Sequence, residues 1–372
     1  MTSATGSKPK ASGGAGVAFP QDALALAANP AGAAFVENRF DLGLSYFRPD
    51  RSASLGSAQF DGNETEQFFI PDIGYKHSLS SHWDFDLAVY GNGGMNTDYS
   101  TSIPGFGATP AGVDLSQVFI TPTFAYKLNE NHALGIAPIL AFQQFKAHGL
   151  ENFGVGNSGY DYSYGGGVRI GYIGKLTEWL TLGATYQSRI FATRFKDYAN
   201  LFAEQGSFDI PSNFAAGLAL RPGRQLTFAL DVERILYSEV KSVGNDLSAA
   251  TFANGLGAAD GPGFGWRDVT AVKTGIAFDA TEHLTLRIGY NYSTPPIPKN
   301  QTYFNILAPG VVQHHLTAGV TWRFREHWEL SAFYAHAFEQ AVRGAGNFFG
   351  PPTDANLRMN QDTFSISLGW WP

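Results

Sequence analysis

The sequence predicts an all-β fold, a transmembrane antiparallel β-barrel of about 14 strands with an N-terminal hatch in its lumen. Three observations predict it. Segments of about ten residues alternate apolar and polar positions, long and short links alternate between them, and the chain begins with a segment rich in small residues. Strands of about ten residues cross a bilayer when tilted, whereas strands of soluble proteins are usually nearer five or six. The pattern therefore favours a membrane barrel over a soluble sandwich.

The composition fits this fold class. Charged residues make up 15% of the chain and aromatic residues 14%, and no apolar run approaches the roughly 18 residues of a transmembrane helix. Lipid-facing and lumen-facing residues alternate in a membrane barrel, so its mean hydropathy is unremarkable. A large soluble β-protein has similar numbers, so composition alone leaves both classes open.

Charge and missing motifs argue against several function classes. The net charge of −7 argues against a nucleic-acid partner. The chain has no cysteine, no GxSxG nucleophile motif and no compact metal-ligand spacing, so we expect no enzyme activity, no cofactor and no metal. The first residues lack the apolar core of a signal peptide, and we infer a mature, truncated or re-engineered start.

The first predicted element is the segment 12–36. Its apolar run, 23–28, is too short to span a membrane, and Asn29-Pro30 ends it, because proline lacks an N–H and disfavours helix in the preceding residue. Two interpretations are open, a plug inside the barrel or a short amphipathic helix packed on a surface. The strands that follow favour the plug. The predicted domains are a hatch, 1–38, and a barrel, 39–372.

The strands follow the hatch. From residue 284 to 291, leucine, isoleucine and tyrosine occupy the even positions, and threonine, arginine, glycine and asparagine occupy the odd ones. A period of two with one apolar face indicates a strand, and a small or charged opposite face suits a wet or plugged lumen. The same alternation occurs in residues 39–48, 179–187, 225–233, 315–324 and 363–370.

The links between strands alternate in length. Short links lie near residues 79–81, 129–131, 175–178, 222–223, 280–282 and 325–326. Long links are 49–67, 92–114, 148–160, 191–212, 238–267, 293–312 and 339–360. Because bacterial barrels have short periplasmic turns and long outer loops, we expect both termini in the periplasm and an integral protein of the bacterial outer membrane. A soluble barrel has no reason to keep this alternation throughout.

Histidine recurs at the short turns, as His82, His132, His283 and His327. A metal site at the rim is one interpretation. We favour the other, that amphipathic residues suit the membrane interface, because each histidine lies on a different turn.

Five stretches of the chain resemble one family. They are GGAGVA (13–18), PQDALA (20–25), NPAG (29–32), YGNGGMNTDY (90–99) and FKDYANLFAEQGSFDIP (195–211). With the strand count and loop alternation, they resemble FadL/TodX-type outer-membrane transporters of long-chain fatty acids and other hydrophobic compounds. The C-terminus departs from the family pattern, because Pro372 stands where such barrels usually carry an aromatic residue.

The resemblance implies uptake by outer-loop capture, lumen binding, hatch movement and lateral release. Lateral release needs a gap in the strand ladder, and glycine accommodates bulges and weakens a strand. The resemblance places this opening at Gly91, Asn92, Gly93 and Gly94; the alternative is an ordinary glycine-rich turn into a long loop. The residues expected to gate the hatch are Gly13, Gly14, Gly16, Asn29 and Pro30.

Ligand capture is expected in an outer loop. Tyr198, Leu201 and Phe202 lie at helical spacing, so a short loop helix would present an apolar stripe to a ligand. The alternative is packing of the loops among themselves.

Three cations fall on lumen-facing positions, Arg169, Lys273 and Arg287. A fatty-acid carboxylate would favour such a cation, so these residues are candidate ligand contacts. The alternative is pairing with lumen acids: Asp86, Asp231 and Glu233.

The expected partners are a hydrophobic small molecule, either a fatty acid or a hydrocarbon, together with membrane lipid and lipopolysaccharide, and we expect a monomer. Two other functions stay open, a passive porin for small polar solutes and a structural or adhesive surface barrel. A porin would lack a plug and usually keep a charged constriction, so single-channel conductance separates it from a plugged transporter.

Overall fold

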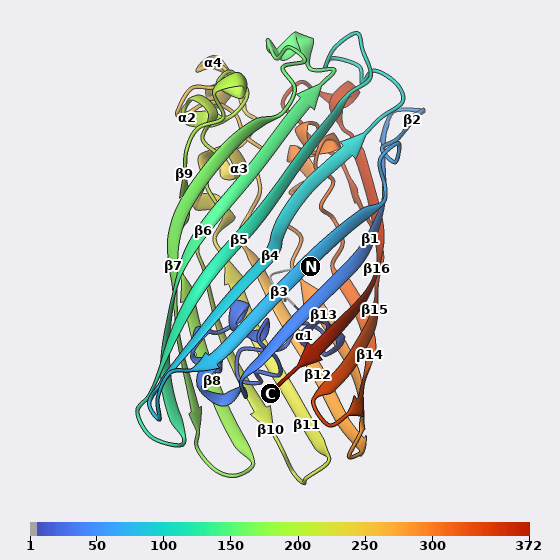
Figure 1. The fold of residues 1–372 in the computed structure, drawn as a ribbon. Helices are drawn as coiled ribbons and strands as arrows, with labels where there is room; N and C mark the ends of the chain where they lie inside the picture. Colours follow the sequence, from blue (N-terminus) through green and yellow to red (C-terminus); the bar gives the residue numbers. More distant parts are fainter. Residues whose placement is uncertain (1–5) are drawn as a thin grey trace.

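The structure is a computed structural model and describes residues 6–372. In this part of the chain, fourteen tilted antiparallel strands follow one another around a closed barrel (Figure 1). They are β1 (Arg39–Leu55), β3 (Phe68–Ser78), β4 (Trp83–Asp98), β5 (Gly112–Lys127), β6 (His132–His148), β7 (Asp161–Lys175), β8 (Leu180–Gln187), β10 (Asn213–Leu220), β11 (Leu226–Ile235), β12 (Val269–Thr281), β13 (Leu284–Ser293), β14 (His314–Arg325), β15 (Trp328–Arg343) and β16 (Asn356–Trp370).

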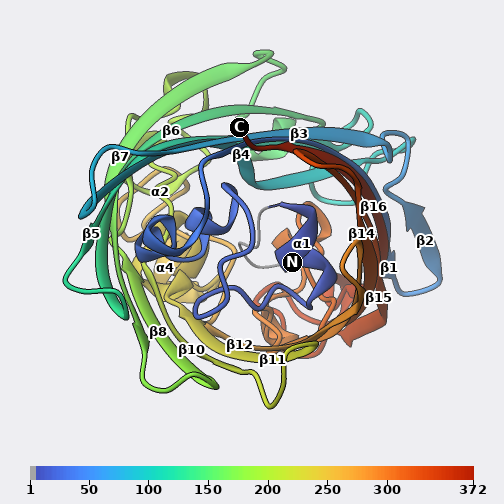
Figure 2. The ribbon, with the colours of Figure 1, turned by 60° about the horizontal axis from the view of Figure 1, so that its bottom comes forward.

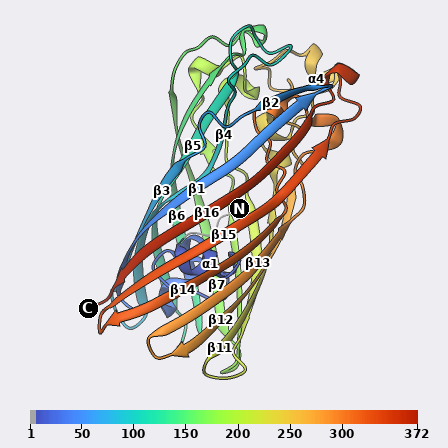
Figure 3. The ribbon, with the colours of Figure 1, turned by 90° about the vertical axis from the view of Figure 1, so that its right-hand side faces the viewer.

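Two short strands extend the barrel wall without joining its circuit. β2 (Ala58–Asp61) pairs with the end of β1, and β9 (Phe191–Ala192) pairs with β7. The circuit closes between the first and last strands, from Phe40 opposite Trp370 to Ser54 opposite Asn356 (Figure 3). The predicted closed barrel of about 14 strands is therefore confirmed.

The predicted alternation separates the two faces of the wall. On β13, Ile288 is 50% exposed on the outside, whereas Asn291 is 2% exposed and faces the lumen. An apolar outer face with a polar inner face is the arrangement of a membrane barrel. The same outward exposure recurs around the wall, at Leu42, Leu140, Ile170, Phe214, Leu316 and Ile366.

Short turns gather at one end of the barrel and long loops at the other (Figure 1). Several strands run further toward the loops than predicted: β1 reaches Leu55, β4 reaches Asp98 and β15 reaches Arg343. Backbone pairing does not require an apolar face, so hairpins continue past the apolar band from which the strands were predicted. The long links are shorter by that amount.

The described helices are all short, and none is long and apolar enough to cross a membrane. The α-helices are α1 (Ser7–Ala11), α2 (Ala203–Gly206), α3 (Lys241–Gly244) and α4 (Ala249–Ala253). The 3₁₀-helices are η1 (Ala25–Ala27), η2 (Pro30–Phe35), η3 (Glu151–Phe153), η4 (Lys196–Tyr198), η5 (Tyr237–Glu239), η6 (Lys299–Gln301), η7 (Phe304–Ile306) and η8 (Pro351–Thr353).

Residues 6–36, here called the N-terminal segment, lie inside the barrel (Figure 2). They carry α1, η1 and η2 and sit in the half nearer the short turns (Figure 1). The first five residues of the predicted hatch lie outside the described residues.

Candidate functional site

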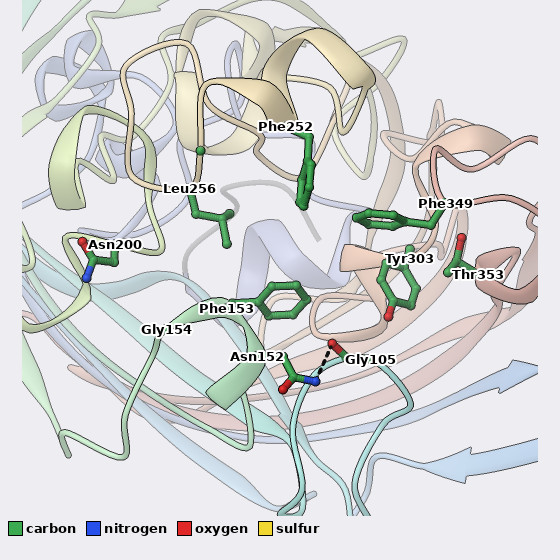
Figure 4. Close-up of a pocket in the computed structure, with 11 residues that line it drawn as sticks. Gly105, Asn152, Phe153, Gly154, Asn200, Phe252, Leu256, Tyr303, Phe349 and Thr353 are labelled. Atoms are coloured by element: carbon green, nitrogen blue, oxygen red, sulfur yellow. Dashed lines mark hydrogen bonds between the residues drawn. The ribbon is translucent and has the colours of Figure 1, made fainter.

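The long loops enclose an apolar pocket of about 660 Å³. Figure 4 shows the rings of Phe153, Phe252, Tyr303 and Phe349 facing it from four different loops. Phe252 and Phe349 pack edge to face, with centroids 5.1 Å apart. Among the described residues, no charged side chain lines this outer pocket. Such a surface suits an uncharged apolar molecule, because a charged group would lose its hydration there without gaining a partner.

Two polar side chains that line the outer pocket bond to other protein groups. Asn152 donates to the carbonyl of Gly105 at 3.3 Å, and the Tyr303 hydroxyl donates to the carbonyl of Pro104 at 2.8 Å. Burial raises the pKa of Tyr303, so this hydroxyl stays neutral. The rings, rather than hydrogen-bonding groups, therefore dominate what the pocket offers to a ligand.

An inner apolar pocket lies next to the outer one and shares Phe153 and Leu256 with it. It holds about 30 Å³, and its other walls include Phe145, Leu201 and Phe202. Phe145 and Phe202 pack with ring centroids 4.8 Å apart. The two pockets are therefore neighbours within the apolar core of the loops.

The predicted loop helix across Tyr198, Leu201 and Phe202 is wrong. η4 ends at Tyr198 and α2 starts only at Ala203, because Phe202 between them has extended backbone angles, φ −90° and ψ 140°. All three side chains still lie at the inner pocket or beside it. Leu201 and Phe202 line the inner pocket, and Tyr198 packs edge to face on Phe145 at 4.8 Å.

Glycines of the wall make room for the N-terminal segment below. An added Cβ at each of eight lumen-facing glycines would come within 3.0 Å or less of a segment atom. Three pairs of them stand directly opposite each other on neighbouring strands, as in Gly135 and Gly171. Since any larger side chain would displace the segment, these glycines form its seat. This glycine ring consists of Gly74, Gly135, Gly171, Gly183, Gly217, Gly275, Gly289 and Gly319.

Asn29, one of the predicted gating residues, fixes the segment at its sharpest turn. Its side-chain oxygen accepts from the Ala31 amide at 3.1 Å and so caps η2, in which Pro30 is the first residue. Its side-chain nitrogen donates to the carbonyls of Val17 at 2.8 Å and Tyr172 at 3.0 Å. One buried side chain therefore ties two parts of the segment to the wall.

The predicted gating glycines lie against the opposite wall. Gly13 donates through its amide to the Thr317 hydroxyl at 3.0 Å, and Gly16 donates to the Asp231 carboxylate at 2.7 Å. Gly13 and Gly14 have φ angles of 68° and 87°, which L side chains rarely adopt. The structure thus places all five predicted gating residues inside the lumen.

A buried ionic cluster holds the start of the segment. Lys8 and Arg39 both contact the carboxylate of Glu329, and Arg39 also contacts Asp41 at 2.7 Å. Burial lowers the pKa of Lys8 and raises the pKa of Asp22 to about 7, with a further upward contribution from Asp41. The segment is therefore seated by charge as well as by shape.

The wall has a break between β3 and β4. Their pairing runs from Ser78 opposite Asp84 to Asp72 opposite Tyr90, and within the described chain it goes no further. β4 nevertheless continues beside β5 as far as Asp98, with a register shift between Gly91 and Gly93. The extra residue of this bulge is Asn92.

This break is bounded at both ends. One edge is formed by residues 68–71 of β3, and the other by residues 91–97 of β4. Tyr90 marks the inner end, and at the outer end Asp98 exchanges backbone bonds with the loop before β3. We call this break the β3–β4 window.

The predicted opening residues sit on the β4 edge of the window. Gly93 and Gly94 are exposed, and Ile70 of β3 packs so closely on Gly91 that a Cβ there would lie 2.8 Å from its Cγ2. The Asn92 amide donates to the Gln117 side chain at 3.4 Å. The glycine-rich stretch is therefore a bulge within a strand, and the long loop starts only after Asp98.

The three predicted lumen cations all contact protein groups. Arg169 bonds to the Ala27 carbonyl of the N-terminal segment, and Arg287 donates to the Gln21 side chain at 2.8 Å. Lys273 pairs with Glu233 at 2.6 Å, as the alternative interpretation had it for this residue. Two of the three cations thus hold the segment.

No group of three or more His, Cys, Asp or Glu side chains within residues 6–372 is arranged to hold a metal ion.

Comparison with known proteins identifies the family. The model of a family described as "Outer membrane protein transport protein (OMPP1/FadL/TodX)" matches residues 1–363. The chain belongs to this family. It is a family of transport proteins, which agrees with the absence of catalytic motifs, and it places the barrel in the bacterial outer membrane. No curated protein sequence matches the chain.

Solved structures share the fold at low sequence identity. The toluene transporter TodX of P. putida superposes with a TM-score of 0.76 at 16% identity, covering 100% of this chain and 99% of that one. A FadL homologue of Pseudomonas aeruginosa gives 0.74 at 16%, covering 98% of both chains. The toluene transporter TbuX of Ralstonia pickettii gives 0.68 at 18%, covering 99% and 98%.

The glycine ring was not predicted from the sequence. Gly183, Gly289 and Gly319 were visible as small residues on the polar faces of their strands. Alternation indicates which face a residue takes but not what presses against that face. The signal that would have identified the ring is the repetition of glycine on the lumen face of strand after strand.

Proposed function

We propose that this protein takes up neutral hydrophobic small molecules across the outer membrane, capturing them in the outer pocket and releasing them sideways through the β3–β4 window. The observation that carries the proposal is the window, a bounded stretch of the wall in which two neighbouring strands do not pair. The route leads to lipid, because Phe69, beside the break, is 65% exposed on the apolar outer face. A porin for polar solutes has no use for such a side exit.

An aromatic or aliphatic hydrocarbon suits the outer pocket better than a fatty acid. Four aromatic rings line it, and rings favour edge and face contacts with other rings. A carboxylate would meet no cation there, and the three lumen cations have protein partners. Two of the relatives with this fold are named toluene transporters, which agrees with this choice.

Movement of the N-terminal segment is the proposed gate. Leu24 and Ala27 of the segment share an apolar cluster with Tyr90, the residue that ends the β3–β4 ladder. A ligand leaving the inner pocket for the window must displace this cluster. Gly13, Gly14 and Gly16 would flex while Asn29 and Pro30 keep their turn, so that ligand shifts the population between two segment positions.

A reversible disulfide across the window tests the proposal. The chain has no cysteine, so Ile70→Cys/Gly91→Cys introduces the one possible bond, and the closeness of the two side-chain positions suits disulfide geometry. We expect the oxidised variant to lose uptake of labelled toluene into cells and to regain it on reduction.

The matched control is Ala335→Cys/Thr363→Cys, a directly opposed pair on β15 and β16, where the wall is already closed. Its oxidation should leave uptake unchanged. Undiminished uptake through the oxidised window variant would refute lateral release at this place, and a preference for laurate over toluene would refute the neutral ligand.

A further inference from the structure

The outer end of the β3–β4 window is organised around one buried arginine of β1. Arg51 is 2% exposed. Its Nη1 donates to the backbone carbonyl of Asn96 on β4 and also to the Asn96 side-chain oxygen at 3.0 Å. Its Nη2 donates to the carbonyl of Thr65, in the loop before β3, at 2.6 Å. A single guanidinium thus joins β1, this loop and β4.

Arg51 also reaches the other edge of the window. Its guanidinium carbon lies 6.0 Å from the ring centre of Phe68, the first residue of β3. Arg51 makes no ion pair with any described residue, and uncharged oxygens accept its hydrogen bonds. A planar fork of donors is suited to holding two backbone segments at a fixed separation, which a lysine ammonium cannot do equally well.

We propose that Arg51 is a positioning residue that closes the outer end of the β3–β4 window and confines release to the side of the barrel. This inference rests on the proposed lateral release. Without the guanidinium, the carbonyls of Asn96 and Thr65 lose their charged donor. The remaining links are two backbone bonds of 3.1 Å at Asp98 and one side-chain bond from Thr65 to Asp98. The window then extends outward, above the level of Gly91.

Arg48 provides a matched control on the same strand. It donates to Glu66 of the same loop at 3.1 Å, and its side chain is 53% exposed. It ties β1 to the loop, and within residues 6–372 none of its hydrogen bonds or ion pairs reaches β4. Loss of Arg48 therefore removes a similar residue without removing the link across the break.

The test combines each arginine variant with the Ile70→Cys/Gly91→Cys disulfide, which closes only the inner end of the window. Uptake of labelled toluene is measured before and after reduction for the stapled protein alone, with Arg51→Ala and with Arg48→Ala. We expect the oxidised disulfide to block uptake in the stapled protein alone and in its Arg48→Ala variant. The oxidised Arg51→Ala variant should take up about tenfold more toluene than either of these, because it has lost hydrogen bonds to a charged group.

The outcomes separate the two proposals. Equal blocking of all three proteins overturns the role of Arg51 and leaves lateral release standing, whereas uptake through the oxidised parent overturns lateral release itself. If Arg51→Ala does not fold, Arg51→Lys and amide hydrogen exchange replace it. Exchange at Asp98 and Glu64 should then be about tenfold faster while Ile190 and Ile210 are unchanged, and unchanged Asp98 exchange contradicts the proposal.

Discussion

The barrel wall is interrupted in two places, and only one of them is open. At the β3–β4 window, residues 68–71 and 91–97 do not pair with each other, so the strand ladder is open there although Ile70 packs on Gly91. At the second place β8 stops pairing with β10 after Gln187. The chain there turns inward, and Ile190 exchanges two backbone bonds with Ile210, so this break is sealed.

The neighbouring strand carries glycines in both cases. Beside the sealed break, a Cβ on Gly167 would lie 2.8 Å from Ile190, whose side chain fills the space. Arg189 reinforces the seal through Asp209 at 2.8 Å and the Glu239 carbonyl at 2.7 Å. Glycine permits an irregular wall at both places, and the backbone bonds between Ile190 and Ile210 distinguish the sealed break from the window.

The largest expected effect comes from emptying the sealed break. Ile190→Ala removes a fully buried side chain and should lower the free energy of unfolding by about 2–5 kcal/mol. Urea unfolding in lipid measures this. Ile139→Ala, in the same apolar cluster, should cost a similar amount. With the Ile70→Cys/Gly91→Cys disulfide oxidised, only Ile190→Ala should restore some toluene uptake. Equal restoration by Ile190→Ala and Ile139→Ala would contradict the role of Ile190 in sealing the break.

Filling the open break should act on transport rather than on stability. A Cβ at Gly93 would meet only the flexible end of Gln117, at 3.0 Å, so Gly93→Val should fold. Side chains in the window should then lower uptake about tenfold, the effect of roughly 1.4 kcal/mol of added steric cost. Gly167→Val should show the converse, a loss of thermal stability with uptake per folded molecule unchanged.

Loosening the N-terminal segment should affect the turn at Asn29 first, because this side chain ties the segment to the wall. Asn29→Ala removes a helix cap and two further hydrogen bonds, for about 1–2 kcal/mol. Hydrogen exchange at the Ala31 amide should rise accordingly. Asn29→Asp keeps the side-chain acceptor, so its exchange rate at the Ala31 amide should lie between those of the parent and Asn29→Ala. Protection equal to that of the parent would show that the turn does not depend on this side chain.

The smallest expected effect is a pH dependence of the same segment. Asp22 has a folded pKa of about 7, above its ordinary value of 3.8, mainly because it is buried. The folded protein therefore binds this proton more tightly than the unfolded chain does. The resulting stability is fully present below pH 3.8 and is lost as the pH rises through 7. Thermal unfolding at pH 5 and pH 8 should differ by an amount that Asp22→Asn removes.

Much of the fold was predictable, because period-two alternation fixes which residues face lipid and the links reveal which end carries the loops. The two breaks show where prediction stops. YGNGGM (90–95) and YGGGV (164–168) are similar glycine-rich stretches in similar strands, and local sequence does not say that Ile190 bonds to Ile210 beside the second one. The family resemblance, rather than the glycines, singled out the first stretch. Contacts between residues distant in sequence decide how each break is bounded, and the hydrogen bonds of the Arg51 guanidinium are among these contacts.

The ionic cluster beneath the N-terminal segment has a consequence for how the barrel assembles. The strands that close the barrel, β1 and β16, lie near the two ends of the chain. Pairing segments so far apart in sequence has a large loop-closure entropy cost and is slow. Ser7 contacts Ser365 of β16, and Lys8 and Arg39 meet on Glu329 of the adjoining β15. The segment that occupies the lumen therefore also bonds to the strands at which the ring closes, and these contacts offset part of the entropy cost of closure.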